Sequence, residues 1–495
     1  MRLSQLIEEI EYTCLQGNPD TEITKLAYDS READEGAVFV CIEGFRSDGH
    51  EFAAQTVRQG ARAVVVSKEV ELQEDVTVIF TEDTRLALAC MSAAFFGHPA
   101  RELTVIGVTG TKGKTTTTYM IRDMLEAAGI RTGLIGTIEV ILGDEAFSAN
   151  NTTPESYTLQ SYFRKMADAG LKVVVMEVSS QGVMLHRVSG FTFEIMVFTN
   201  IEPDHIGPGE HKDFADYMRC KGLPFKTCRI GIANADDVHM NEVLKGHTCV
   251  LETFGTKPDA DLYATDIDID SELGGLGVKC KVHGSMSFDA EISIPGSFSV
   301  YNALAAIAVV RHFNVPAAVI QEVLKKISVK GRMELVDISP RFTLMIDYAH
   351  NAMSLGNLLS ALKEYKPKRL VCMFGCGGGR ARDRRFEMGE FSSRLADLTV
   401  VTSDNPRHEE PQAIIDDIIT GVKRGGGEYT QVYDRKEAIR YCIIQARDGD
   451  MIVLAGKGHE DYQDICGVKY PMDERVMIRD IIAEMTPEER AELAG

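Results

Sequence analysis

The stretch VIGVTGTKGKTTTTYM, Val105–Met120, places an apolar run, spaced glycines and Gly-Lys-Thr directly before a helical segment. A loop that holds phosphate groups needs inward-facing N–H groups, glycines for close approach, a lysine and a hydroxyl for Mg²⁺. The residues that meet these needs are Gly110, Gly113, Lys114 and Thr115. The common pattern requires glycine where Val108 stands, but this mismatch concerns only the entry turn. The stretch therefore predicts a nucleotide site, and a Gly/Thr-rich turn without a ligand is disfavoured because all these features occur together.

Composition narrows the class of protein. The 495 residues are 44% hydrophobic and carry a formal net charge of -21, which argues against a nucleic-acid partner. The eleven cysteines form no CxxC pair, which disfavours a disulfide framework and favours a reducing cytosol. The N-terminus is acidic where a signal peptide would be basic and then apolar, and no apolar run has bilayer-spanning length. We expect a cytoplasmic protein without a membrane partner.

The chain divides by pattern into three expected α/β domains, 1–98, 99–328 and 329–495. In the middle block, near-continuous apolar runs such as KVVVMEVSS predict a mostly parallel sheet with helices on both faces. From about Thr253 to Pro295 the apolar period becomes two, which predicts a small antiparallel insert. The last block repeats a strand-then-loop pattern and predicts a Rossmann-like domain.

Two polar residues follow buried strands of the middle block. Glu177 ends the strand in VVVMEVSSQG, and His205 follows the strand in VFTNIEPDH. Because the carboxyl ends of parallel strands line one crevice, we expect both side chains beside the phosphate loop, where they would hold Mg²⁺. Either residue alone would be read as a helix-capping Glu or a turn His. The loop by itself leaves a nucleotide switch, a kinase and an ATP-driven ligase open.

The motifs GVTGTKGKTTT, EVSSQG, TNIEPDHIG, YNALAA, GRMELV and DYAHNAMSL occur in this order along the chain. In these motifs the chain resembles the Mur ligases, cytoplasmic ATP-dependent enzymes that build the stem peptide of peptidoglycan, over nearly its whole length. The spaced-glycine loop is that family's variant, which accounts for Val108. The resemblance is closest to the members that add the third residue of the peptide. A uridine-nucleotide-binding role is implied for 1–98, ATP binding for 99–328 and amino-acid binding for 329–495.

The resemblance also implies roles for individual residues. The implied ATP-binding residues are Thr109, Gly110, Thr111, Lys112, Gly113, Lys114, Thr115, Asn302, Arg332 and Asp347. The implied contacts to the UDP-muramoyl-dipeptide are Ser30, Asn151, Thr152, Thr153, Ser180 and Arg187. The implied catalytic residues are Lys114, Glu177, His205 and Lys221. The implied Mg²⁺ ligands are Thr115, Glu177, His205 and Lys221, the last as a carbamate formed with CO₂ (N6-carboxylysine).

The stretch TSDNPRHEEP bears on the amino acid that is added. Asp-Asn-Pro-Arg characterises the family members that use meso-2,6-diaminopimelate. This amino acid has a carboxylate at its distal end, and the guanidinium of Arg407 could form a bidentate ion pair with that carboxylate. The implied amino-acid contacts are Arg380, Asp404, Asn405, Pro406, Arg407, Gly456 and Glu460. Gly379, Ala381 and Phe386 depart from the family's usual pattern, so L-lysine or another diamino acid stays open.

The reaction that the resemblance implies joins diaminopimelate to UDP-N-acetylmuramoyl-L-alanyl-D-glutamate through an acyl phosphate, with ATP and Mg²⁺ as cofactors. The expected partners are these small molecules, and the expected state is a monomer. The alternative from the same superfamily is a folylpolyglutamate-type ligase, which should lack the uridine-binding domain and the Asp-Asn-Pro-Arg stretch. No ligand spacing in the sequence supports a zinc site.

Overall fold

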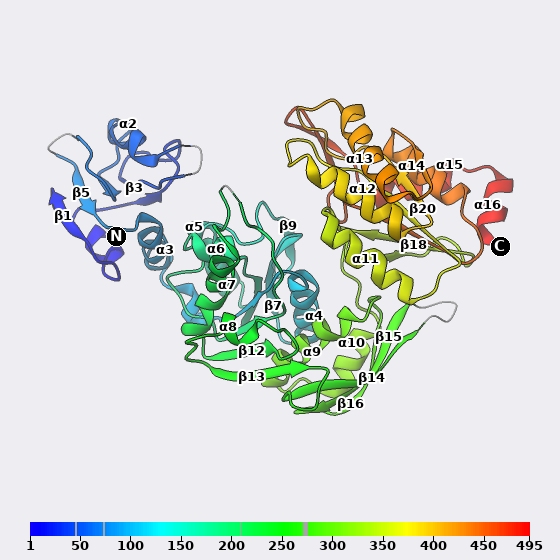
Figure 1. The fold of residues 1–495 in the computed structure, drawn as a ribbon. Coiled ribbons are helices and arrows are strands. Elements are labelled where there is room, and N and C mark those ends of the chain that lie inside the picture. Colours follow the sequence, from blue (N-terminus) through cyan, green and yellow to red (C-terminus); the bar gives the residue numbers. More distant parts are fainter. Residues whose placement is uncertain (45–46, 73–74, 208, 271–275) are drawn as a thin grey trace. The chain divides into compact units, whose positions relative to one another are not determined.

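The computed structural model describes residues 1–44, 47–72, 75–207, 209–270 and 276–495 (Figure 1). The chain divides into two compact units, Met1–Tyr263 with Leu304–Val319, and Ala264–Ala303 with Ile320–Gly495. The domain boundaries expected at 98 and 328 stay predictions. Within the described ranges, no helix combines the length and the apolar character needed to cross a membrane.

The first unit begins with a five-stranded sheet in the order β1-β5-β4-β3-β2, parallel except for β1. The runs AVFV and AVVV form β3 and β4, and every residue in them is buried, as expected for strands covered on both faces. The small α/β domain predicted from these runs is confirmed. Its elements are α1 (Leu3–Leu6), β1 (Thr13–Gln16), β2 (Lys25–Ala27), β3 (Ala37–Val40), α2 (Ala53–Arg58), β4 (Ala63–Val66), β5 (Thr77–Phe80) and α3 (Thr84–Phe95).

The central sheet of this unit runs β13-β12-β11-β6-β10-β7-β8-β9, and it is parallel from β13 to β7. Helix α4 packs against β6, β7 and β10. The predicted parallel sheet is confirmed. Its strands are β6 (Thr104–Thr109), β7 (Thr132–Ile135), β8 (Glu139–Leu142), β9 (Glu145–Ser148), β10 (Val173–Glu177), β11 (Ile195–Phe198), β12 (Ile230–Asn234) and β13 (Val250–Gly255). Its helices are α4 (Lys114–Ala127), α5 (Ser156–Asp168), α6 (Ser180–Met184), α7 (Phe214–Gly222) and α8 (Met240–Val243).

The antiparallel insert begins later than the sequence period suggests. β13 pairs in parallel with β12 and also with the start of β14 (Leu262–Asp270), so the segment after Thr253 still belongs to the parallel part. The antiparallel pair is β15 (Gly277–Gly284) with β16 (Phe288–Ile292). Residues 271–275 of the predicted insert lie outside the described ranges. Helices α9 (Phe298–Val310) and α10 (Ala317–Leu324) follow, and both are shared between the two units.

The second unit contains a six-stranded sheet in the order β17-β18-β22-β19-β20-β21, parallel except for β17. Side chains of α14 and α15 share one apolar core with alternate residues of β18, β19 and β22. The Rossmann-like prediction is confirmed. The strands are β17 (Glu334–Val336), β18 (Thr343–Asp347), β19 (Arg369–Phe374), β20 (Leu398–Val401), β21 (Tyr429–Gln431), β22 (Asp450–Ala455) and the hairpin β23 (Tyr462–Ile465) with β24 (Val468–Pro471). The helices are α11 (Ala352–Glu364), α12 (Asp383–Leu395), α13 (Pro411–Gly425), α14 (Arg435–Ile444), α15 (Glu474–Glu484) and α16 (Pro487–Ala494).

Candidate active site

The phosphate loop joins the end of β6 to the first turn of α4. Gly110 and Gly113 have φ angles of +150° and +83°, which glycine adopts readily and other residues rarely do. Val108 lies inside β6, fully buried, with Val197 and Glu177 as its partners on the neighbouring strands. The position that carries glycine in the common pattern is therefore strand here, and the loop begins only at Gly110.

The loop is braced by the segment that follows β11. The backbone N–H of Thr111 donates to the carbonyl of Asn200 at 2.9 Å, and that of Lys112 donates to Oδ1 of Asn200 at 3.0 Å. The hydroxyl of Thr199 donates to the carbonyl of Lys112 at 2.7 Å. Thr199 and Asn200 are not among the predicted site residues, although both stand in the motif TNIEPDHIG. Their signal is the polar pair directly after a buried strand.

Replacing Gly110 by alanine tests this bracing. A Cβ atom at Gly110 would lie 1.9 Å from Oγ1 of Thr199, in a backbone conformation that side chains rarely adopt. Strain of this kind costs about 1–3 kcal/mol, so we expect Gly110→Ala to weaken ATP binding by roughly 10- to 100-fold in titration calorimetry. Gly129→Ala is the matched control, since Gly129 also has positive φ but has open space around it. Equal effects of the two substitutions would contradict a specific role for the close approach.

Two lysines converge on one carbonyl of the loop. Nζ of Lys114 donates to the carbonyl of Gly110 at 2.9 Å, and Nζ of Lys221, from α7, donates to the same oxygen at 2.7 Å. Lys221 is 1% exposed. Burial, together with the positive charge of Lys114, lowers the pKa of the Lys221 amine well below its usual range. The structure therefore brings both lysines to the loop, and Lys221 has the environment of a neutral amine.

Glu177 presents a fixed carboxylate beside the start of α4. It is 1% exposed, and its Oε1 accepts a hydrogen bond from the hydroxyl of Thr115 at 3.0 Å and from the N–H of Thr137 at 2.8 Å. A carboxylate and a hydroxyl side by side are the hard oxygen donors that Mg²⁺ prefers. The residues present at Thr115 and Glu177 thus fit the ion that the sequence predicts there.

His205 has different neighbours from those expected. Its side chain is 57% exposed, with Nδ1 3.3 Å from a carboxylate oxygen of Glu210 and Nε2 4.0 Å from one of Asp204. The structure pairs it with these acids rather than with Glu177. Its φ of +55° shows that a tight turn, more than the strand end, sets the direction of this residue. A role for His205 as an Mg²⁺ ligand stays a prediction.

The predicted acceptor-binding residues of the first unit gather around the end of β10. The hydroxyl of Thr153 donates to the carbonyl of Glu177 at 3.0 Å, and Nη1 of Arg187 donates to the carbonyl of Thr153 at 3.1 Å. The hydroxyls of Thr152 and Thr137 lie 3.0 Å apart, which links this cluster to the carboxylate of Glu177.

Two predicted contacts lie outside this hydrogen-bonded cluster. Asn151 is exposed, and Ser30 is half-buried in the turn after β2. The turn that holds Ser30 lies near α5, since the rings of Tyr28 and Tyr157 have centroids 6.0 Å apart.

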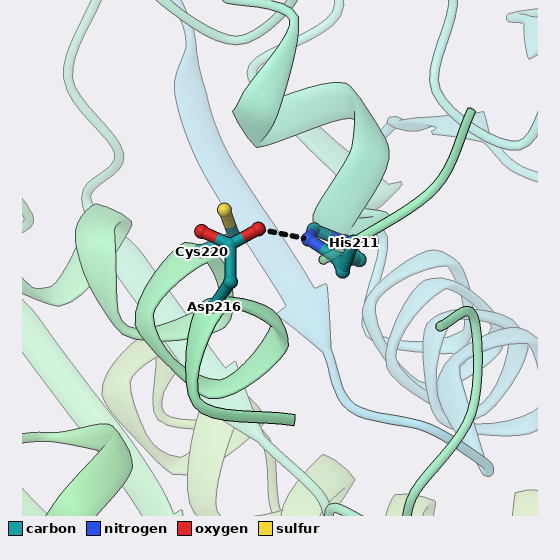
Figure 2. A group of neighbouring side chains, drawn as sticks. All are labelled: His211, Asp216 and Cys220. Atoms are coloured by element: carbon teal, nitrogen blue, oxygen red, sulfur yellow. Dashed lines mark hydrogen bonds and ion pairs between the residues drawn. The ribbon is translucent and has the colours of Figure 1, made fainter. Parts of the chain in front are cut away.

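Ser180 has a partner that the sequence analysis did not identify. Its Oγ lies 2.9 Å from Nε2 of His211. Nδ1 of His211 in turn lies 3.1 Å from a carboxylate oxygen of Asp216, and Figure 2 shows this pair. His211, Asp216 and Cys220 also place their possible metal-binding atoms within 4.8 Å of one another. Asp216 already pairs with Arg219 at 2.8 Å, and burial raises the pKa of the Cys220 thiol. These features favour a hydrogen-bonded cluster over a zinc site.

The second unit has a pocket at the carboxyl ends of its parallel strands. It collects the predicted amino-acid contacts from the loops after β19, β20 and β22, as expected where parallel strands end together. The predicted residues in its wall are Arg380, Asp404, Asn405, Arg407, Gly456 and Glu460. Pro406 is the predicted residue that does not line it; its carbonyl would lie 2.0 Å from a Cβ at Gly378, so it packs the two loops together.

The buried Lys457 forms hydrogen bonds with two residues of the pocket wall, Asn405 and Glu460. It is fully buried, and its Nζ donates to Oδ1 of Asn405 at 2.6 Å and to Glu460 at 3.1 Å. Nδ2 of Asn405 donates to the same carboxylate oxygen of Glu460 at 2.9 Å. The side chains of Asn405 and Glu460 are therefore fixed by one buried ammonium. The sequence does not single out Lys457, although Gly456 and Glu460 beside it are predicted contacts, because nothing in a lone lysine signals burial.

Replacing Lys457 by methionine removes the charge and keeps most of the volume. Asn405 and Glu460 then lose a shared donor, at a cost of about 1.5–3 kcal/mol for hydrogen bonds to a charged group. We expect the KM for the amino-acid substrate to rise by at least tenfold, with the KM for ATP unchanged, in steady-state assays of phosphate release. Lys469→Met is the control, since Lys469 is exposed on β24. An unchanged amino-acid KM in Lys457→Met would show that Asn405 and Glu460 do not need this support.

Arg407 enters the pocket in an unusual backbone conformation. Its φ is +52°, and its backbone N–H donates to the carbonyl of Asp464 at 3.0 Å, at the end of the β23 hairpin. Its guanidinium donates to the carbonyl of Gly378, and its Nε lies 3.8 Å from a carboxylate oxygen of Asp464. The loops after β19 and β20 and the hairpin thus fix the direction of this cation.

The remaining predicted ATP contacts belong to the second unit. Both carboxylate oxygens of Asp347 accept backbone N–H groups, from Met333 and Ala349, each at 2.8 Å. Burial nevertheless raises the pKa of Asp347. The guanidinium of Arg332 lies 4.8 Å from the ring centroid of Tyr348. Asn302 is buried on α9.

The first unit has a braced phosphate loop on a parallel sheet, with two lysines bonded to one carbonyl of the loop. The second unit adds a Rossmann-like domain with a charged pocket. These features are those of a nucleotide-binding enzyme of several domains. Comparison with known proteins agrees. Three family models match along the chain: "Mur ligase family, catalytic domain" at 22–101, "Mur ligase middle domain" at 108–310 and "Mur ligase, glutamate ligase domain" at 331–458. The chain belongs to the Mur ligase family.

Individual relatives match over nearly the whole chain. A protein of Caldanaerobacter subterraneus subsp. tengcongensis named UDP-N-acetylmuramoyl-L-alanyl-D-glutamate--2,6-diaminopimelate ligase is 39% identical, over 98% of this chain and 99% of its own. A protein of the same name from Clostridium perfringens is also 39% identical, over 97% and 99%. A solved structure of a ligase with this name has a TM-score of 0.70 and 27% identity, covering 98% and 99% of the two chains. The chain is therefore similar to these ligases from end to end.

Proposed function

We propose that this protein is an ATP-dependent ligase that adds meso-2,6-diaminopimelate to UDP-N-acetylmuramoyl-L-alanyl-D-glutamate in cytoplasmic peptidoglycan precursor synthesis. The observation that carries the proposal is the pocket of the second unit, in which Arg407 and Arg380 stand with Asp404 and Glu460. Diaminopimelate carries a carboxylate and an ammonium at its distal end, and this pocket offers a partner of opposite charge for each. L-lysine lacks the distal carboxylate and could not form this ion pair with Arg407.

The first unit supplies the phosphoryl-transfer half of the reaction. The phosphate loop with Lys114 and the N-terminus of α4 would hold the phosphates of ATP. Thr115 and Glu177 would hold Mg²⁺, which when bound supplies positive charge against the phosphates. Lys221 as a carbamate would be a further ligand, and His205 is proposed as another. These residues act by positioning groups and stabilising charge, which accounts for most of the catalysis in phosphoryl transfer.

Amide formation from a carboxylate and an amine needs an activated leaving group. The D-Glu carboxylate of the bound muramoyl-dipeptide would attack the γ-phosphorus of ATP, which releases ADP and forms an acyl phosphate. The amine of diaminopimelate would then attack the acyl carbon, lose a proton and expel orthophosphate. Thr152, Thr153 and Arg187, clustered beside Glu177, are proposed to hold the dipeptide. We assign the uridine nucleotide to 1–98 and Ser30, ATP to 99–328 and the amino acid to 329–495.

Purified protein incubated with ATP, Mg²⁺, the UDP-muramoyl-dipeptide and a panel of amino acids tests the proposal. We expect orthophosphate release that depends on both the acceptor and diaminopimelate, and a product whose mass equals that of the joined substrates. A kinase would release no orthophosphate, and a nucleotide switch would not respond to an amine. Turnover with a folate in place of the UDP-sugar would indicate a folylpolyglutamate-type ligase. Faster turnover with L-lysine would refute the argument from Arg407.

A further inference from the structure

Ser180 carries a hydroxyl that its own helix does not use. α6 is capped by the preceding residue, Ser179, whose Oγ accepts the N–H of Gly182 at 3.0 Å. Ser180 is 4% exposed, and its Oγ faces the imidazole of His211 at 2.9 Å. Because the hydroxyl of Ser180 does not cap the helix and bonds to His211, the imidazole ring sets the direction of this hydroxyl.

His211 is held on both sides. It is 1% exposed, its Nδ1 lies 3.1 Å from Oδ2 of Asp216, and its ring centroid lies 5.2 Å from that of Tyr217. Asp216 lies in the first turn of α7, where Asp213 accepts its backbone N–H at 2.7 Å. The helix start therefore fixes the backbone of Asp216, and the carboxylate of Asp216 holds the ring.

The hydrogen bonds determine where the protons lie. Oδ1 of Asp216 accepts from Nη2 of Arg219 at 2.8 Å, and this hydrogen bond holds the pKa of Asp216 below its usual range. An ionised carboxylate only accepts, so Nδ1 of His211 carries the proton. With that tautomer, Nε2 has a lone pair whenever the ring is neutral, and the hydroxyl of Ser180, 2.9 Å away, then donates to it. The oxygen of Ser180 is left with lone pairs alone for any other partner.

We propose that His211, held by Asp216, is a positioning residue that turns the hydroxyl of Ser180 into a hydrogen-bond acceptor for an amide N–H of the UDP-muramoyl-dipeptide. The inference rests on the proposed function, in which Ser180 contacts this substrate. The carboxylates and phosphates of the substrate present lone pairs, which the oxygen of Ser180 would repel. The peptide N–H groups are the complementary partners, so Ser180 recognises the peptide part of the substrate through a hydrogen bond.

Two substitutions of His211 separate this role from a structural one. The amide of glutamine reaches the position of Nε2 and can accept from Ser180, whereas that of asparagine overlays Nδ1 and contacts Asp216 only. We expect His211→Asn to raise the KM for the UDP-muramoyl-dipeptide by about tenfold, the effect of one hydrogen bond. His211→Gln should restore a KM within about threefold of the wild-type value. The KM values for ATP and diaminopimelate should not change in either variant.

Substrate analogues test the same contact without changing His211. Two analogues are needed, and in each of them an ester oxygen replaces a different amide N–H of the dipeptide part. We expect one analogue to raise the KM of the wild type about tenfold and to cause no further rise in Ser180→Ala. An equal penalty in Ser180→Ala, or an unchanged KM in a folded His211→Asn variant, overturns the proposal. If the wild type makes no product with the natural acceptor, the proposed function fails and this inference fails with it. If the wild type makes product but its KM responds neither to substitution of His211 nor to the esters, this inference alone is wrong.

Discussion

Lys221→Ala should lower kcat for amide formation by about 10³-fold, the scale seen when one charge-stabilising group is removed from an active site. The amine of Lys221 is buried, bonded to the carbonyl of Gly110, and shifted toward its neutral form by burial and by Lys114. A neutral amine adds to CO₂ and releases a proton, and a carbamate formed on Lys221 would be an anion beside the phosphate loop. Phosphate release with saturating substrates measures the loss.

Two further variants decide whether the carbamate or the cation matters. Lys221→Arg places a positive charge at this position but cannot add CO₂, so we expect it to be as inactive as Lys221→Ala. A short carboxylic acid such as acetate should partly restore Lys221→Ala, because it can occupy the space of the missing carbamate. Lys226→Ala, at an exposed position shortly after Lys221, should retain full activity. Wild-type turnover by Lys221→Arg would refute the carbamate.

Arg407→Ala should reduce kcat/KM for diaminopimelate by roughly 10²- to 10³-fold, within the range for losing one partner of a buried charge pair. The β23 hairpin and the carbonyl of Gly378 hold this guanidinium at the pocket wall, so its direction is fixed before the substrate binds. ATP binding should not change, because Arg407 is not among the residues proposed to contact ATP. Steady-state kinetics with diaminopimelate, and calorimetry with ATP, measure the two effects.

The matched substitution is Arg407→Lys. A lysine keeps the charge but lacks the planar fork, so it should recover only part of the lost kcat/KM. Lys423→Ala, on the exposed side of α13, controls for a general effect of removing positive charge from the second unit. Full activity of Arg407→Ala would remove this residue from the amino-acid site. A variant that gains turnover with L-lysine as it loses diaminopimelate would identify Arg407 as the specificity residue.

Helices and strands could be predicted where the sequence pattern that specifies them lies within the element itself. A continuous apolar run before spaced glycines and Lys-Thr specifies a strand, a tight turn and a helix, and the structure has β6, the loop and α4 at those places. The start of the antiparallel insert was predicted too early, because a period of two reports which side chains are buried and not the direction of the neighbouring strand. That direction is set by contacts distant in the sequence.

The site was predictable only in part, for a related reason. Strand ends brought Arg380, Asp404 and Gly456 into one pocket, as the topology requires. Lys457 and His211 were missed because their importance lies in burial and in partners from other loops, which the sequence does not display. His205 was expected beside Glu177 from its position after a strand, but the turn at this residue directs its side chain to nearby acids.

The brace between the phosphate loop and the end of β11 has a consequence for inhibitors. Because Asn200 already engages the N–H groups of Thr111 and Lys112, a compound that needs a wider loop would have to break those bonds and displace the polypeptide that follows β11. Selective compounds are therefore better built outward from the pocket of the second unit, where Ala381, in its wall, departs from the usual pattern of the family.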